Sequence, residues 1–111
     1  MFIADLNDKY YALRIKAIHA LNMEKSDIKN AAIPVLSALA KTDVNTLAKA
    51  AAITALGALK DPAFLPIFKD AVNSRSYAVQ GAALAALNGL EPAQAFTLAK
   101  SFEKDNEAAL T

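Results

Sequence analysis

The chain has 111 residues, 55% of them hydrophobic and 21% charged, which is enough apolar material for the core of one domain. Its 12 lysines and arginines nearly balance its 11 aspartates and glutamates. This balance argues against a broad basic surface for nucleic acid or acidic lipid. The lack of cysteine excludes disulfides and thiolate metal sites. No apolar run approaches the ~20 residues that cross a bilayer, and the 26 alanines favour an all-helical protein.

Residues 1–23 are predicted to form the end of one helix and a complete second helix. The opening MFIADLND, residues 1–8, matches IFKDAVNS at residues 67–74, which we assign below to the end of a helix. In the segment 11–23, apolar residues recur every three or four positions, which predicts an amphipathic helix. We name helices of the first kind A and of the second kind B. The predicted core face of this B helix consists of Leu13, Ala17, Ile18 and Leu21.

Residues 27–59 are predicted to form the first complete pair of helices. The A helix is expected from Asp27 to Lys41, with Ser26 or Asp27 as its N-terminal cap, and it contains Pro34. The B helix covers 47–59. Its core positions, each 35 residues after its equivalent in the first B helix, are Ala48, Ala52, Ile53 and Leu56.

Residues 62–90 repeat the pattern. Asp61 is a predicted N-cap, with Pro62 at the first helical position, where the missing N–H costs no hydrogen bond. The A helix, 62–72, contains Pro66 near the position of Pro34, which predicts a bend in both A helices. The B helix covers 77–90, and its mid-helix Gly81 is expected to allow a close helix contact. Its core positions, 31 residues after the preceding set, are Val79, Ala83, Leu84 and Leu87.

Residues 92–111 are predicted to begin another unit. A third A helix is expected from 92 to 103, with Glu91 as a weaker cap, and residues 106–111 match the start of a fourth B helix. Both ends of the chain would then fall inside a repeat, which predicts a piece of a longer protein. Two helices per 31–35 residues indicate an all-α, right-handed α-solenoid of antiparallel hairpins in one domain, 1–111. Its parts would be the partial repeat 1–23, the repeats 27–59 and 62–90, and the partial repeat 92–111.

These units resemble HEAT repeats over nearly the whole chain. Such repeats have an A helix with a central proline, an aspartate in the turn, and a B helix that opens with valine-arginine and ends in ALG-x-L. The matching residues, six positions apart in each unit, are Asp8 and Arg14, Asp43 and Lys49, and the neutral pair Ser74 and Gln80. The B helices end in Ala20-Leu21, ALGAL at 55–59 and ALNGL at 86–90. We expect each aspartate to accept helix N–H groups and to face a basic residue of a neighbouring layer, in a ladder that weakens at the third unit.

The sequence carries no catalytic or metal-binding motif. His19 is the only histidine, so no second imidazole can complete a zinc site, and we expect His19 to face solvent. The three glycines are isolated and form no phosphate-binding loop. We therefore expect no catalytic residue, no metal ligand and no cofactor in this chain.

The resemblance to HEAT repeats implies a binding surface on the concave side, where the B helices lie. The candidate residues occupy positions outside the core face: Tyr11, Lys16, His19, Lys49, Thr54, Tyr77 and Gln80. Tyr11 and Tyr77 occupy equivalent first-turn positions. Each suits either an interface anchor or a wedge that packs between helices.

Two functions stay open at this point. Residues 5–21, DLNDKYYALRIKAIHAL, resemble the C-terminal helical region of bacterial zinc aminopeptidases of the membrane alanyl aminopeptidase family. That resemblance implies a non-catalytic domain that shapes peptide access to an active site, with zinc held by a separate domain of the parent chain. The alternative is a HEAT-repeat scaffold without enzymatic activity that binds a peptide or a protein. Nucleic-acid binding would need a basic face, which the even charge count disfavours.

Overall fold

The computed structural model describes residue 6 and residues 9–100. These residues form α1 (Tyr11–His19), α2 (Ser26–Thr42), α3 (Thr46–Gly57), the 3-10 turn η2 (Pro62–Phe64), α4 (Leu65–Ala71) and α5 (Tyr77–Leu90). A further helical stretch covers 92–100. No strand occurs within these ranges. The predicted segments at 1–5, 7–8 and 101–111, including Asp8, lie outside the described residues.

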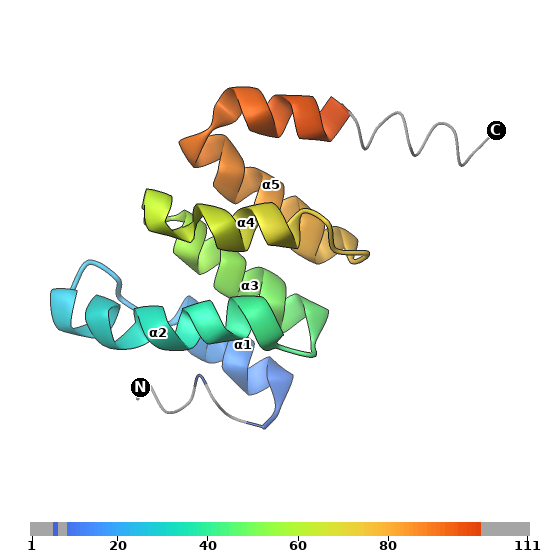
Figure 1. The fold of residues 1–111 in the computed structure, drawn as a ribbon. Coiled ribbons are helices and arrows are strands. Elements are labelled where there is room, and N and C mark those ends of the chain that lie inside the picture. Colours follow the sequence, from blue (N-terminus) through green and yellow to red (C-terminus); the bar gives the residue numbers. More distant parts are fainter. Residues whose placement is uncertain (1–5, 7–8, 101–111) are drawn as a thin grey trace.

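The helices lie in two layers (Figure 1). In this view α2, α4 and the stretch 92–100 are in front, and α1, α3 and α5 lie behind them. α3 packs against α1, α2 and α5, and α4 packs against α5. Each hairpin thus covers the apolar side of its neighbour, and the molecule is elongated, measuring 48 × 28 × 18 Å. This arrangement confirms the predicted all-helical solenoid.

The core follows the predicted faces of the B helices, with one exception. Eleven of the twelve predicted positions are either buried or pack half-buried against the core. Leu13 is 46% exposed, whereas its equivalents Ala48 and Val79 are fully buried, so its assignment to the core is wrong. The reason is a difference in neighbours. α3 packs against three helices and α5 against two, while α1 packs extensively only on α3 among the described helices.

The N-terminal end of α2 differs from the prediction. The N-cap residue is Lys25, and no side chain caps the helix, so the assignment of Ser26 or Asp27 as the cap is wrong. Both residues lie inside the first turn of α2, and the acidic Asp27 still stands where the positive end of the helix dipole favours it. Pro34 lies inside α2, as predicted.

The second A helix is interrupted near its start. The Asp61 cap is confirmed, because the Asp61 carboxylate accepts the Ala63 N–H at 2.9 Å. Pro66 lies inside α4, as predicted, but in its first turn, because a 3-10 turn forms the first part of the predicted helix 62–72. Proline has no N–H to donate to the Pro62 carbonyl, which accepts the Leu65 N–H instead.

A close helix contact occurs at Gly57 and not at Gly81. A Cβ added at Gly57 would lie 2.8 Å from the Ala86 Cβ and 3.2 Å from its Cα, so α3 and α5 approach each other there as only a glycine allows. A Cβ added at Gly81 would have no atom within 4 Å. The predicted close contact at Gly81 is therefore wrong, since this residue faces open space on α5.

We expect alanine to have opposite effects at these two glycines. Gly81→Ala should raise the free energy of unfolding by about 1 kcal/mol, because alanine is the better helix former and nothing obstructs its methyl group. Gly57→Ala should lower it by about 1–3 kcal/mol, because the added methyl group overlaps Ala86. Urea unfolding of both variants measures the two changes. A shift of the same sign in both would contradict the helix spacing described here.

Candidate binding groove

The outer faces of the B helices form an open groove with a volume of about 620 Å³. Its lining comes from three helices: Ile15 and His19 of α1; Leu47, Ala50, Ala51 and Thr54 of α3; and Tyr77, Ala78, Gly81 and Ala82 of α5. Within each helix these residues are spaced mostly by three or four positions, so they share one helix face. This is the face opposite to the core positions, and its side chains are small along most of its length.

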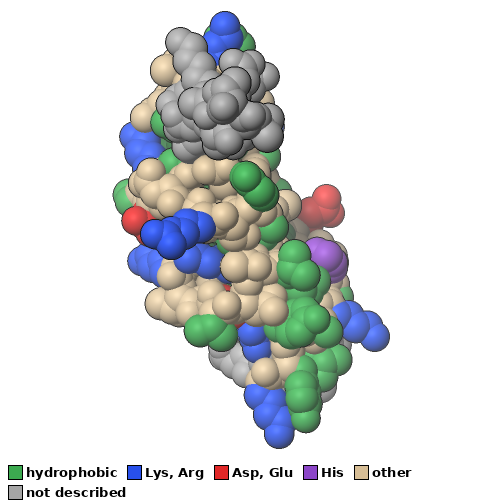
Figure 2. Space-filling view, turned by 90° about the vertical axis from the view of Figure 1, so that its right-hand side faces the viewer, with side chains coloured by type: hydrophobic (Ala, Val, Ile, Leu, Met, Phe, Trp, Pro, Cys, Tyr) green, Lys and Arg blue, Asp and Glu red, His purple; other side chains and the backbone are tan. Residues whose placement is uncertain are grey.

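Large apolar side chains stand at the edge of this groove. Leu47 is 55% exposed and Tyr77 is 78% exposed, and each lies in the first turn of its helix. Figure 2 shows hydrophobic side chains gathered on the right of the view, beside the histidine. The groove therefore combines a shallow alanine-rich floor with exposed anchors of the kind that contribute most to interfaces.

A second, smaller hollow of about 270 Å³ continues the groove along α3 and α5. It shares Thr54 and Ala82 with the groove and extends to Lys60 and Gly89, at the C-terminal ends of the two helices. Its lining is also mostly apolar, so one continuous seam between α3 and α5 is open to solvent.

The structure brings three of the predicted site residues together in the groove, namely His19, Thr54 and Tyr77. Tyr11 and Lys16 are exposed on α1 but do not line the groove. Lys49 and Gln80 are half-buried and do not line it either.

Gln80 has a structural contact instead. Its Nε2 donates to the Val72 carbonyl at 3.2 Å, which ties the end of α4 to α5. The sequence reading missed Leu47, although Leu47 lies one position before the core residue Ala48 and so breaks the pattern of an otherwise small-residue face. This large side chain among small ones is the feature of the sequence that could have identified Leu47.

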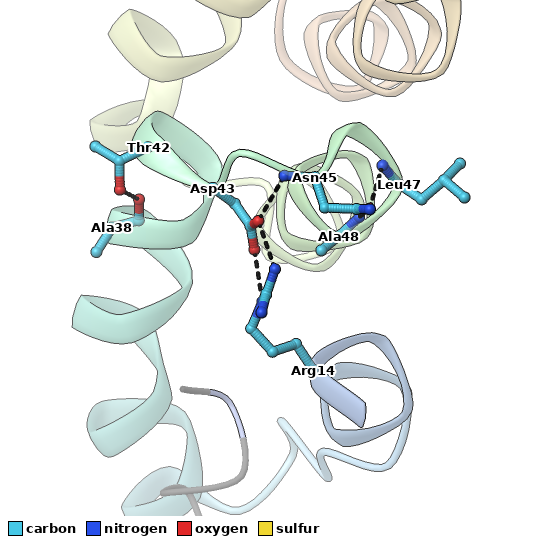
Figure 3. A network of polar contacts seen from close by, with 7 residues as sticks. All are labelled: Arg14, Ala38, Thr42, Asp43, Asn45, Leu47 and Ala48. Atoms are coloured by element: carbon cyan, nitrogen blue, oxygen red, sulfur yellow. Dashed lines mark hydrogen bonds and ion pairs between the residues drawn. The ribbon is translucent and has the colours of Figure 1, made fainter. Parts of the chain in front are cut away.

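A polar network joins α1 to the turn between α2 and α3 (Figure 3). Arg14 donates from Nε and Nη2 to the two carboxylate oxygens of Asp43, at 2.9 and 2.8 Å. The Asp43 Oδ1 also accepts the Asn45 N–H at 2.9 Å, and Asn45 in turn caps α3 by accepting the N–H groups of Leu47 and Ala48. The Arg14 and Asp43 side chains are only 12% and 2% exposed. This confirms the predicted pairing of a turn aspartate with a basic residue of the neighbouring layer.

The next junction lacks such an ion pair. Ser74 stands at the equivalent turn position, and its hydroxyl accepts the Ser76 N–H at 3.1 Å. Ser76 caps α5 by accepting the Val79 N–H. Lys49, the equivalent of Arg14, forms no ion pair with any residue in 9–100. Within the described part of the chain, the predicted series of ion pairs between successive repeats thus ends after the pair of Arg14 and Asp43.

Across residues 9–100, no three histidine, aspartate or glutamate side chains gather closely enough to hold a metal ion. In the same part of the chain, no helix combines the length and the apolar character that a membrane crossing requires.

Comparisons with known proteins give the family. Neither the curated proteins nor the solved structures yielded a match. A family model for HEAT repeats matches residues 2–108, a range that includes every helix described above. The sequence match and the stacked helical hairpins agree, and the chain therefore belongs to the HEAT repeat family.

Proposed function

We propose that this chain is a helical-repeat scaffold that binds another protein through the groove on α1, α3 and α5. The observation that carries the proposal is the groove itself, which crosses three stacked helices and exposes Leu47 and Tyr77 at its edge. When a partner covers side chains of this size, their burial favours binding by roughly 25 cal/mol for each Å² of apolar surface removed from water. HEAT repeats typically mediate protein interactions, and the family match supports the same role.

The aminopeptidase placement has weaker support. It rests on the resemblance of residues 5–21, and no feature of the groove and no comparison favours it. In that placement the groove would face the remainder of a parent chain, and a zinc ion would belong to a separate catalytic domain. The scaffold role needs neither assumption, so we prefer it.

A peptide selection tests the scaffold role. A displayed library of random peptides is enriched on the wild-type protein, and each enriched peptide is then measured against two variants. Gly81→Phe fills the groove from a position with open space around it, so the helix should still fold. Ala38→Phe adds the same side chain to an exposed position of α2, in the other layer.

The expected result is binding to the wild type and to Ala38→Phe with equal affinity, and binding to Gly81→Phe at least about tenfold weaker, which corresponds to about 1.4 kcal/mol. Circular dichroism checks that both variants are folded. Enrichment of no peptide, or peptides that bind all three proteins equally, would show that the groove is not a protein-binding site.

A further inference from the structure

We propose that the partner segment in the groove is an amphipathic helix of about three turns, apolar towards the groove and carrying carboxylates that meet Lys16 and Lys60. This inference rests on the proposed function, because it names the partner of the same groove. Three observations support it: the hydrogen-bonding capacity of the lining, the length and small side chains of the open seam, and the distribution of charge over the B helices.

The lining can offer few hydrogen bonds to a bound backbone. Only His19, Thr54 and Tyr77 bring polar side-chain atoms to the groove. The backbone groups of α3 and α5 are engaged in their own helices, and residues 9–100 contain no strand edge for an extended peptide to join. An extended segment would leave unpaired those of its N–H and C=O groups that it buries against the alanine floor, at about 1–3 kcal/mol each. A helix satisfies these groups internally and is therefore the favoured occupant.

The seam between α3 and α5 sets the length of the occupant. It runs beside α3, which has 12 residues, from Leu47 at the first turn to Lys60 beyond the last. At 1.5 Å per residue, α3 is about 18 Å long, so a partner helix of about 12 residues covers the seam.

The small side chains of the groove floor favour large side chains on the partner. Gly81 is a mid-helix glycine, which costs a helix about 1 kcal/mol relative to alanine. No packing contact in the structure requires it, since a Cβ there would meet no atom within 4 Å. Its lack of a side chain leaves open space over the groove floor formed by Ala50, Ala51 and Ala82, where a large side chain of the partner can lie.

The B helices carry basic residues and no acidic ones. The sequences of α1, α3 and α5 contain no aspartate or glutamate. Among the described residues, the acidic side chains near their ends are mostly engaged elsewhere: Asp43 bonds Arg14, Asp61 caps η2, and Glu91 lies 3.7 Å from Lys69. Glu24 is exposed in the loop after α1. In the described part of the chain, the face around the groove is thus short of negative charge, although the chain as a whole is nearly neutral.

Two lysines place positive charge along this face. Lys16 is exposed on α1 between Ile15 and His19, and its equivalents in the repeat, Ala51 and Ala82, line the groove. Lys60 lines the hollow at the far end of the seam. A partner helix with carboxylates flanking its apolar face would pair with both lysines, and a basic helix would be repelled.

Three synthetic peptides of about 12 residues test the proposal, a length that matches α3. All share one leucine face, and their other positions carry glutamate, glutamine or lysine. Fluorescence anisotropy gives the Kd of each peptide, and circular dichroism shows whether the bound peptide is helical. We expect the glutamate peptide to bind as a helix, about tenfold more tightly than the lysine peptide. Added salt should reduce this preference, and the double variant Lys16→Glu, Lys60→Glu should reverse it.

The outcomes separate this inference from the proposed function. The partner assignment is wrong if the lysine peptide binds as tightly as the glutamate peptide, if the bound peptide is not helical, or if the glutamate peptide fails to bind at about millimolar concentration. The scaffold role survives these results when Gly81→Phe abolishes the binding of library-selected peptides. If Gly81→Phe leaves every peptide bound as tightly as before, the groove is not the site and both proposals fail.

Discussion

Leu56→Ala is expected to lower the free energy of unfolding by about 2–5 kcal/mol, the range measured for buried leucines. Leu56 is fully buried in α3, the helix that packs against α1, α2 and α5. Removing its side chain loses apolar burial and leaves a cavity at the junction of these helices. Refilling that cavity would require several helices to shift together, which close packing resists. Denaturant unfolding followed by circular dichroism gives the change.

Leu47→Ala is the matched control, because it makes the same chemical change in the same helix. Leu47 is 55% exposed at the groove edge, so its truncation should change stability by no more than about 0.5 kcal/mol. Similar losses for Leu47→Ala and Leu56→Ala would show that the two sides of α3 have been assigned the wrong way round.

Arg14→Ala is expected to be the second large effect, at about 3 kcal/mol. The Asp43 carboxylate is 2% exposed, and the guanidinium of Arg14 reaches both of its oxygens. Without the arginine, a nearly buried carboxylate retains the Asn45 N–H but loses its ionic partner. Removing one partner of a buried ion pair costs about 3–5 kcal/mol, and the remaining hydrogen bond places the expected value at the lower end. Thermal and urea unfolding measure it.

Glu91→Gln provides the comparison, because the Lys69–Glu91 pair is longer and open to solvent. Its atoms lie 3.7 Å apart, and the side chains are 46% and 36% exposed. Loss of this pair should change stability by less than about 1 kcal/mol. Equal losses for Arg14→Ala and Glu91→Gln would mean that the Arg14 pair adds nothing beyond an ordinary surface contact.

Much of the fold could be predicted because the chain repeats its helix pattern. The step of 35 residues from Leu21 to Leu56 placed two B helices, and the Asp61-Pro62 pair placed the start of η2. The errors share a physical origin. Leu13 has the right residue type at the right period, but its exposure depends on which helices cover α1, and periodicity within one helix does not report its neighbours.

The two mid-chain glycines show the same limit. The sequence alone does not distinguish Gly57 from Gly81. Only the placement of α3 and α5 shows that a Cβ would be crowded at Gly57 and would have open space at Gly81. The binding groove was predictable only in part for this reason. Its helix face could be assigned from the repeat, while Leu47 and the floor around Gly81 required the helices to be placed side by side.

The interruption between η2 and α4 has a mechanical consequence. In a solenoid each repeat contacts only its neighbours, so the stack can bend. We expect bending to be easiest where a helix is interrupted. Here the discontinuity falls between Phe64 and Leu65, and it leaves α4 with 7 residues against α5. Bending at this point would move η2 relative to α4 and α5, while the tight contact between Gly57 and Ala86 would keep the spacing of α3 and α5 unchanged.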